Sequence, residues 1–280
     1  MAYRLPAVVV HRDPGGLCFT GLVDPEPAPG VDPEALTPAL REYFERHLSA
    51  SETRLAAQLQ LLARHARLPG CRLLDVGVGP GRFMAAAAER GVRARGLEVA
   101  DAALLYSRER TGLPVHKATV EQHARDPAAR PYDAITLWDV LEHVNAPQAA
   151  LDACARLLAP GGVLLLETPC RDGAVHRLAD LGYRLSAGRY TRPLEMLYGS
   201  HAHGHKQILS SAEVRDALQR AGLRVEYAQV VHQLAARHED HLVRLTGSRH
   251  LATALAPAVR ALLARFPVTN KVLAVARKPR

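Results

Sequence analysis

Residues 71–100 read CRLLDVGVGPGRFMAAAAERGVRARGLEVA, and this stretch decides the fold. Residues 73–76 form a short apolar run of the length of a buried strand. The run breaks into a glycine-rich loop, residues 77–81, and residues 82–90 then have the composition of an alanine-rich helix. A second strand is predicted over residues 94–99. The stretch therefore predicts a strand–loop–helix–strand unit whose glycines let a ligand approach the backbone.

The loop and the acid that follows it indicate the kind of ligand. A dinucleotide-binding fingerprint has the spacing Gly-x-Gly-x-x-Gly, whereas here the third glycine, Gly81, comes one residue early. Pro80 lies inside the loop, which offers no obvious cradle for a pyrophosphate. Glu98, at the end of the second strand, can accept hydrogen bonds from both hydroxyls of a ribose. These residues favour a nucleoside ligand over a turn that binds nothing.

A second informative stretch is residues 131–170, PYDAITLWDVLEHVNAPQAALDACARLLAPGGVLLLETPC. Residues 134–137 are predicted to form an apolar strand that ends at Trp138 and Asp139. Open α/β sheets bind their ligands at this carboxyl edge. A helix over 146–158 and a buried strand over 163–167 are predicted to follow.

The glycine loop, Glu98 and the phrase D-V-L-E-H-V…L-L-x-P-G-G together resemble class I S-adenosylmethionine-dependent methyltransferases. The branch they resemble is the small-molecule one that includes the ubiquinone-biosynthesis O-methyltransferases. The resemblance covers residues 71–170 well and the rest only in outline. It implies an α/β fold, a three-layer α/β/α Rossmann-like sandwich on a seven-stranded, mostly parallel sheet. The last strand, residues 270–277, would run antiparallel between the fifth and sixth strands.

The resemblance also implies S-adenosylmethionine as the cofactor and a set of residues that hold it. Residues 118–120 fall where the family holds the adenine, and Glu121 is the only nearby acid. The expected cofactor-binding residues are Asp75, Gly77, Gly79, Gly81, Glu98, Val99, Thr119, Val120 and Trp138.

Asp139, Glu142 and His143 are the first candidates for chemistry. On a helix starting near Asp139, spacings of three and four place all three on one face. Carboxylates suit magnesium and imidazole suits zinc, and the ubiquinone enzymes carry a similar acid-x-x-Glu-His arrangement associated with metal. Two alternatives stay open: Glu142 and His143 brace the loop beside the cofactor, or His143 is catalytic and transfers a proton.

Residues 170–206 are predicted to be an insertion that forms a substrate lid. His201, His203 and His205 alternate near its end. His205 is the second candidate catalytic base, and the other two are expected to be solvated. The arginines of this segment could hold a carboxylate or phosphate of the substrate, although solvated side chains are the simpler interpretation; they are Arg171, Arg177, Arg184, Arg189 and Arg192.

The N-terminal segment, residues 1–69, is expected to cover the site, and residues 70–280 to form the core. Residues 1–37 read as irregular because of their prolines and glycines, apart from a short strand over 7–10. Two helices are predicted over 38–67, with a break near 49–51. Their side chains Tyr43, Phe44 and Arg54 either reach the ligand or serve packing and surface.

Length and composition set the outer bounds. The chain has 280 residues, 48% hydrophobic and 23% charged, which suits one globular domain with elaborations. Its net charge of +8 comes from dispersed arginines with only four lysines, so a solvated surface is favoured over a nucleic-acid footprint. No apolar run approaches the roughly 20 residues of a membrane span, and the four cysteines show no close pairing. A cytoplasmic location is expected.

The predicted function is O-methylation of an acidic hydroxyl on a small molecule. N- or C-methylation of a metabolite, methylation of tRNA or protein, and a non-catalytic cofactor-binding scaffold remain the alternatives. Such a protein mainly aligns the nucleophile and removes its proton where needed. The oligomeric state is not predicted.

Overall fold

The fold is described from a computed structural model. It covers residues 1–48, 52–199, 204–232, 242–243, 246–265 and 268–280. Its main element is a seven-stranded sheet. In spatial order the strands are β10 (Arg224–Val231), β11 (Lys271–Arg277), β8 (Leu158–Pro169), β7 (Tyr132–Trp138), β4 (Arg72–Val76), β5 (Arg93–Glu98) and β6 (Val115–Lys117).

The strand directions confirm the predicted sheet. β4 pairs in parallel with β5 and β7, β5 with β6, and β7 with β8. β11 is antiparallel to both of its neighbours, β8 and β10. The last strand is therefore inserted between the fifth and sixth, as the resemblance implies.

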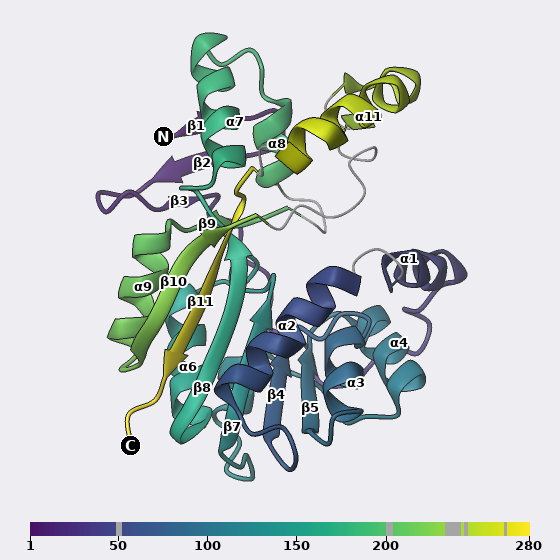
Figure 1. Cartoon of the computed structure of the whole chain (residues 1–280), viewed down its shortest axis with the longest axis vertical. Helices are drawn as coiled ribbons and strands as arrows, with labels where there is room; N and C mark the ends of the chain where they lie inside the picture. Colours follow the sequence, from purple (N-terminus) through teal and green to yellow (C-terminus); the bar gives the residue numbers. More distant parts are fainter. Residues whose placement is uncertain (49–51, 200–203, 233–241, 244–245, 266–267) are drawn as a thin grey trace.

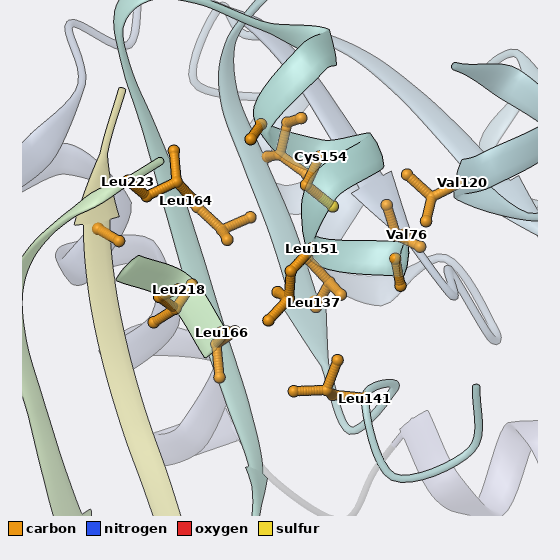
Figure 2. Close-up of a cluster of buried hydrophobic side chains, with 14 of the residues drawn as sticks. Val76, Val120, Leu137, Leu141, Leu151, Cys154, Leu164, Leu166, Leu218 and Leu223 are labelled. Carbon is orange, nitrogen blue, oxygen red and sulfur yellow. The ribbon is translucent and has the colours of Figure 1, made fainter. Parts of the chain in front are cut away.

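Helices cover both faces of this sheet, because its strands point apolar side chains to each side in alternation. On one face Leu74, Leu137 and Leu166 pack against Leu151 of α6 (Pro147–Leu157) and Leu218 of α9 (Ser211–Arg220). Figure 2 shows Leu137, Leu151, Leu166 and Leu218 in one cluster of buried side chains.

On the other face the alternate strand residues, such as Leu73 and Leu165, pack against two helices. These are α2 (Glu52–His65) and α3 (Arg82–Ala88), and α4 (Asp101–Thr111) adds Leu104. Figure 1 shows α2 and α3 in front of the sheet, with α6 and α9 on the opposite side. The three-layer α/β/α prediction is confirmed.

The expectation of an irregular N-terminal segment is wrong for residues 1–19, whereas residues 20–37 contain no helix or strand. Three short strands form there, β1 (Tyr3–Arg4), β2 (Val9–Arg12) and β3 (Cys18–Phe19), where the sequence predicted only one strand over 7–10. They build a four-stranded sheet with β9 (Gln207–Ile208) in the order β1-β2-β3-β9. The strands escaped prediction because β3 is completed by a partner almost 190 positions along the chain.

The small sheet has a core of its own. Tyr3, Val10 and Cys18 pack with Leu194 and Tyr198. Two helices that follow β8, α7 (Ala174–Leu185) and α8 (Arg192–Leu197), complete it. Figure 1 shows this unit, called the small lobe below, beyond the carboxyl edge of the large sheet. The N-terminus and the segment after β8 thus fold together.

The remaining elements are short or peripheral. α1 (Pro38–Leu48) precedes α2, and the predicted break at 49–51 lies outside the described residues. α5 (Val120–His123) follows β6, and α11 (Arg249–Arg265) precedes β11. All four cysteines are buried free thiols. None of the described helices combines the length and apolar character that crossing a membrane requires.

Candidate active site

The loop between β4 and α3 consists largely of glycine because its backbone is left-handed. Gly77, Gly79 and Gly81 have φ of 68°, 53° and 78°, a region that other residues rarely occupy. A Cβ atom at Gly77 would lie 2.5 Å from Cγ2 of Val140, whereas one at Gly79 would have nothing within 4 Å. The loop is therefore packed at Gly77 and open to a ligand at Gly79.

Glu98 is held rigidly at the carboxyl end of β5. Its Oε2 accepts the N–H of Gly79 at 2.8 Å, and its Oε1 accepts those of Val99 and Ala100 at 2.8 and 3.0 Å. Burial raises the pKa of the Glu98 carboxyl, and these N–H donors oppose that rise. Because a carboxylate has about four acceptor sites, capacity remains for about one hydroxyl of a ligand.

Asp75, on β4, is a second buried carboxyl at this edge. It accepts a hydrogen bond of 2.7 Å from Oγ1 of Thr136. Burial raises the pKa of Asp75 to about 7, the Thr136 hydroxyl opposes this, and the charge of Glu98 adds to the rise. A neutral Asp75 can donate as well as accept near neutral pH.

A cleft of about 600 Å³ opens above these residues. Six of the nine expected cofactor residues line it, namely Asp75, Gly77, Gly79, Glu98, Val99 and Trp138. The indole of Trp138 packs edge-on against Phe83, with ring centroids 5.2 Å apart. Its Nε1 is buried with no hydrogen-bond partner among the described residues. The two rings thus give the cleft an apolar wall.

The other three expected cofactor residues do not line the cleft. Gly81 forms the N-cap of α3. Thr119 caps α5: its Oγ1 accepts the N–H of Gln122, whose side chain accepts the N–H of Thr119. Val120 is buried in the main core. The local hydrogen bonds of Thr119 and the burial of Val120 leave their side chains engaged within the fold.

Two cations and two carboxylates form a compact cluster on one side of the cleft. Nη2 of Arg54, from α2, lies 2.8 Å from Oδ2 of Asp139 and 2.5 Å from Oε1 of Glu167. Nζ of Lys271, the first residue of β11, lies 2.6 Å from both oxygens of Asp139 and 3.2 Å from Glu167. The charges balance, and the cluster ties α2 to three strands of the sheet.

The cluster fixes the charge of its members. Burial favours a neutral Asp139, but Lys271 and Arg54 outweigh it and hold the pKa of Asp139 well below its ordinary value. The same contacts raise the pKa of Arg54 despite its burial. Asp139, expected as a metal ligand, therefore has its carboxylate engaged by two cations.

The helix expected to start near Asp139 is wrong. Asp139 has a φ of 58°, which a right-handed helix does not allow. Residues 141–143 form a turn, and α6 begins only at Pro147, which occupies its first turn. Glu142 and His143 therefore project from a turn, and their neighbours are set by tertiary contacts.

That turn brings Glu142 and His143 together with His205. One ligand-type atom of each lies within 4.8 Å of the others. The imidazole rings of His143 and His205 are 5.2 Å apart and nearly perpendicular. His143 lines the cleft, and Glu142 and His205 lie behind it. His201 and His203 lie outside the described residues.

Glu142 is the most buried member of this group. Oγ1 of Thr168 donates to its Oε2 at 2.8 Å, and its Oε1 has no hydrogen-bond partner among the described residues. Burial raises the pKa of Glu142 to about 8, and the charge of Asp139 adds to the rise. The carboxyl is therefore protonated at neutral pH unless a cation binds it.

Comparisons with known proteins agree with this geometry. A family model described as a methyltransferase domain matches residues 43–228. The ubiquinone biosynthesis O-methyltransferase of Xylella fastidiosa (strain 9a5c) is 31% identical over 206 residues, which cover 71% of this chain and 80% of that enzyme. The protein of the same description from Xanthomonas axonopodis pv. citri (strain 306) is 32% identical. The match covers 71% of this chain and 82% of that protein.

The chain belongs to the S-adenosylmethionine-dependent methyltransferases. Two solved structures share the fold of this methyltransferase. A chain of the complex between the Haloferax volcanii Trm112 methyltransferase activator and the putative methyltransferase has a TM-score of 0.59 and 18% identity, covering 90% and 100% of the two chains. The magnesium protoporphyrin IX methyltransferase of Synechocystis PCC 6803 with bound SAH has a TM-score of 0.55 and 13% identity. The match covers 86% of this chain and 98% of that chain.

The residues of this methyltransferase fit its cofactor. The open backbone at Gly79 and the residual acceptor capacity of Glu98 suit a ribose, and the exposed side chain of Val99 offers an apolar face beside it. Arg54 lines the same cleft. The sequence offered Arg54 either ligand contact or packing, and only the fold shows the side chain at the cleft wall.

The lid arginines of the methyltransferase are placed away from the cleft. None of the described residues of 170–206 lines it. Arg171 pairs with Glu213 at 2.6 Å, and Arg184 with Asp180 at 2.9 Å. Three cleft-lining residues from the N-terminal segment went unpredicted, Asp24, Leu55 and Gln58, because nothing in their local sequence marks them.

Proposed function

We propose that this methyltransferase methylates oxygen, at an acidic hydroxyl of a small molecule. The observation that carries the proposal is the placement of His143 at the wall of the cofactor cleft, with His205 and Glu142 beside it. Supporting it, the curated relatives are described as O-methyltransferases. The substrate would enter beside His143, with α2 forming part of the cleft wall.

The cofactor supplies a methyl group activated by its sulfonium charge. The protein's part is to align the acceptor oxygen and to take its proton. His143 is placed to accept that proton, because histidine is the side chain that changes charge near neutral pH. The ring of His205, set nearly at right angles, supports the orientation of His143. Glu98 and the glycine loop hold the nucleoside.

A pH–rate profile tests the base role. The acceptor is a phenol found by screening with labelled cofactor, and the variants are His143→Ala, His205→Ala and the exposed control His250→Ala. We expect His143→Ala to lower kcat about a hundredfold and to remove the acidic limb of the profile, with a smaller loss for His205→Ala. Full rate in both variants, or methyl label only in RNA or protein, would refute the proposal.

As the alternative to a base role for His143, we propose that Glu142, His143 and His205 form a divalent-cation site, in which His205 replaces the expected ligand Asp139. The buried Oε1 of Glu142 and the proximity of the three ligand atoms support this. A bound cation would hold the substrate's oxygen close to the cleft; bracing of the loop by the same side chains is the alternative.

Metal titration tests the cation site through its pH dependence. Binding must release the proton of Glu142, whose pKa is about 8. The apparent affinity for Mg²⁺ or Zn²⁺ should therefore rise about tenfold per pH unit below that pKa, as measured by calorimetry. Glu142→Gln should abolish binding and Asp139→Asn should retain it. Activity that survives exhaustive chelation, with no binding by calorimetry, would exclude the cation site and leave the bracing and proton-transfer roles.

A further inference from the structure

The turn that carries Glu142 and His143 is held mainly by hydrogen bonds from a distant segment of the chain, residues 206 and 207. Inside it, only the N–H of His143 donates to a backbone carbonyl of the same turn, that of Val140 at 2.9 Å. Nε2 of Gln207 donates to the carbonyls of Leu141 at 2.9 Å and Val144 at 2.7 Å, 66 and 63 positions away. One side-chain amide therefore fixes the backbone on both sides of the Glu142–His143 pair.

The backbone around Gln207 completes this attachment. The carbonyl of Glu142 accepts the N–H of Lys206 at 2.9 Å and that of Gln207 at 3.4 Å. Nζ of Lys206 donates to Oδ1 of Asn145 at 2.6 Å, at the end of the turn. Residues 206 and 207 therefore fix the position of the turn.

Gln207 is itself firmly placed. Its residue is 5% exposed, and it opens β9, where it pairs with Phe19 of β3. His205 lies two residues before it on the same short segment. A single segment therefore carries one imidazole of the group and the amide that positions the other.

We propose that Gln207 is a positioning residue for methyl transfer. Its amide holds the turn so that His143 and Glu142 stay within reach of His205. Gln207 is not among the cleft-lining residues, so it acts through the turn and not on the ligands. The inference rests on the proposed function for the chemical role of His143, whereas the positioning itself is a statement about the free protein.

The variants separate the amide's donor capacity from its size. Gln207→Met keeps the length and removes the donor, and Gln207→Lys keeps an N–H donor near both carbonyls. Gln148→Met is the matched control, because Gln148 also donates through Nε2 to a backbone carbonyl, that of Ala217 at 3.1 Å, on the covering helices α6 and α9.

The first measurement uses the protein alone. Ring protons of histidine, assigned with His143→Gln and His205→Gln, report the contact between the two imidazoles by NMR. We expect Gln207→Met to lose this contact, while Gln207→Lys and Gln148→Met keep it. A contact that persists in Gln207→Met, or disappears equally in Gln207→Lys, overturns the proposal.

The second measurement uses turnover. With saturating cofactor and the screened acceptor, Gln207→Met should lower kcat about tenfold while the Kd for S-adenosylhomocysteine changes less than about twofold. If kcat, cofactor affinity and melting temperature fall together, Gln207 supports only the fold and the proposal is wrong. Failure of the proposed function would appear separately, as full activity of His143→Ala with the NMR contact still dependent on Gln207.

Discussion

Glu98 is organised before any cofactor arrives, since three backbone N–H groups already hold its carboxylate. The glycine at position 79 supplies one of these donors, and a Cβ atom there would have nothing within 4 Å. Binding then needs little rearrangement at this residue, and its affinity depends on a geometry that a shorter side chain cannot reproduce.

Glu98→Ala should weaken binding of S-adenosylmethionine and S-adenosylhomocysteine by about 1–3 kcal/mol, the cost of leaving polar groups unpaired. Isothermal titration calorimetry measures the change directly. Glu89→Ala, which removes an exposed carboxylate at the end of α3, is the control and should bind as the wild type does. Equal affinity in Glu98→Ala would contradict the assignment of this residue to the cofactor.

Local spacing is what made these residues predictable. The glycines, Asp75 and Glu98 belong to one contiguous stretch whose strand–loop–helix pattern is visible without a fold. Lys271 and Gln207 could not be found in this way, because their partners lie 132 and 66 positions away. The expectation for Thr119 rests on the resemblance alone, and the structure shows its side chain engaged in a local capping box.

Among the elements, α2 is attached to the sheet by the cluster of Arg54, Asp139, Glu167 and Lys271. Removing one cation leaves a net negative charge among poorly solvated groups. Breaking a buried pair in this way is strongly destabilising, whereas removing both partners is much less so.

Lys271→Met should lower the free energy of unfolding by about 3 kcal/mol, and the double variant Lys271→Met/Glu167→Gln by clearly less. Denaturant unfolding measures both, with the exposed Arg280→Met as control. Additive losses in the double variant would show that the two side chains do not share one electrostatic cluster.

The small lobe contains a histidine that resists protonation. Nε2 of His176 lies 3.0 Å from the hydroxyl of Tyr198. Burial lowers the pKa of His176 to about 4. The positive charges of Arg171 and Arg12 lower this pKa further, whereas the negative charge of Asp180 raises it. Because the unfolded chain binds this proton near pH 6.5, the contribution of His176 to stability is present above that pH and is lost as pH falls toward 4.

Replacing His176 by Gln should therefore flatten the acid limb of the stability curve. Between pH 7 and pH 4 the wild type should lose on the order of 3 kcal/mol more than His176→Gln, measured by chemical unfolding at each pH. His11→Gln, an exposed position on β2, should follow the wild type. Parallel curves for wild type and His176→Gln would show that this histidine does not titrate as a buried group.

For the whole molecule, the large sheet followed from the sequence and the small lobe did not. Two nearly continuous motifs specify β4, β5, β7 and β8 with their helices, and the resemblance supplied the antiparallel last strand. The lobe joins strands from the first twenty residues to β9 and to α7 and α8. Segments so short and so distant carry no periodic pattern, since each is stabilised only by the others.

The position of β11 bears on how the protein is made. This strand lies between β8 and β10 and pairs along seven residues with each, yet it follows the other six strands of the large sheet along the chain. Until residues 271–277 have been synthesised, β8 presents an unpaired edge and β10 has no neighbour in the large sheet. Such an edge is prone to join strands of other chains. A nascent chain that stops before residue 271 therefore has no finished core.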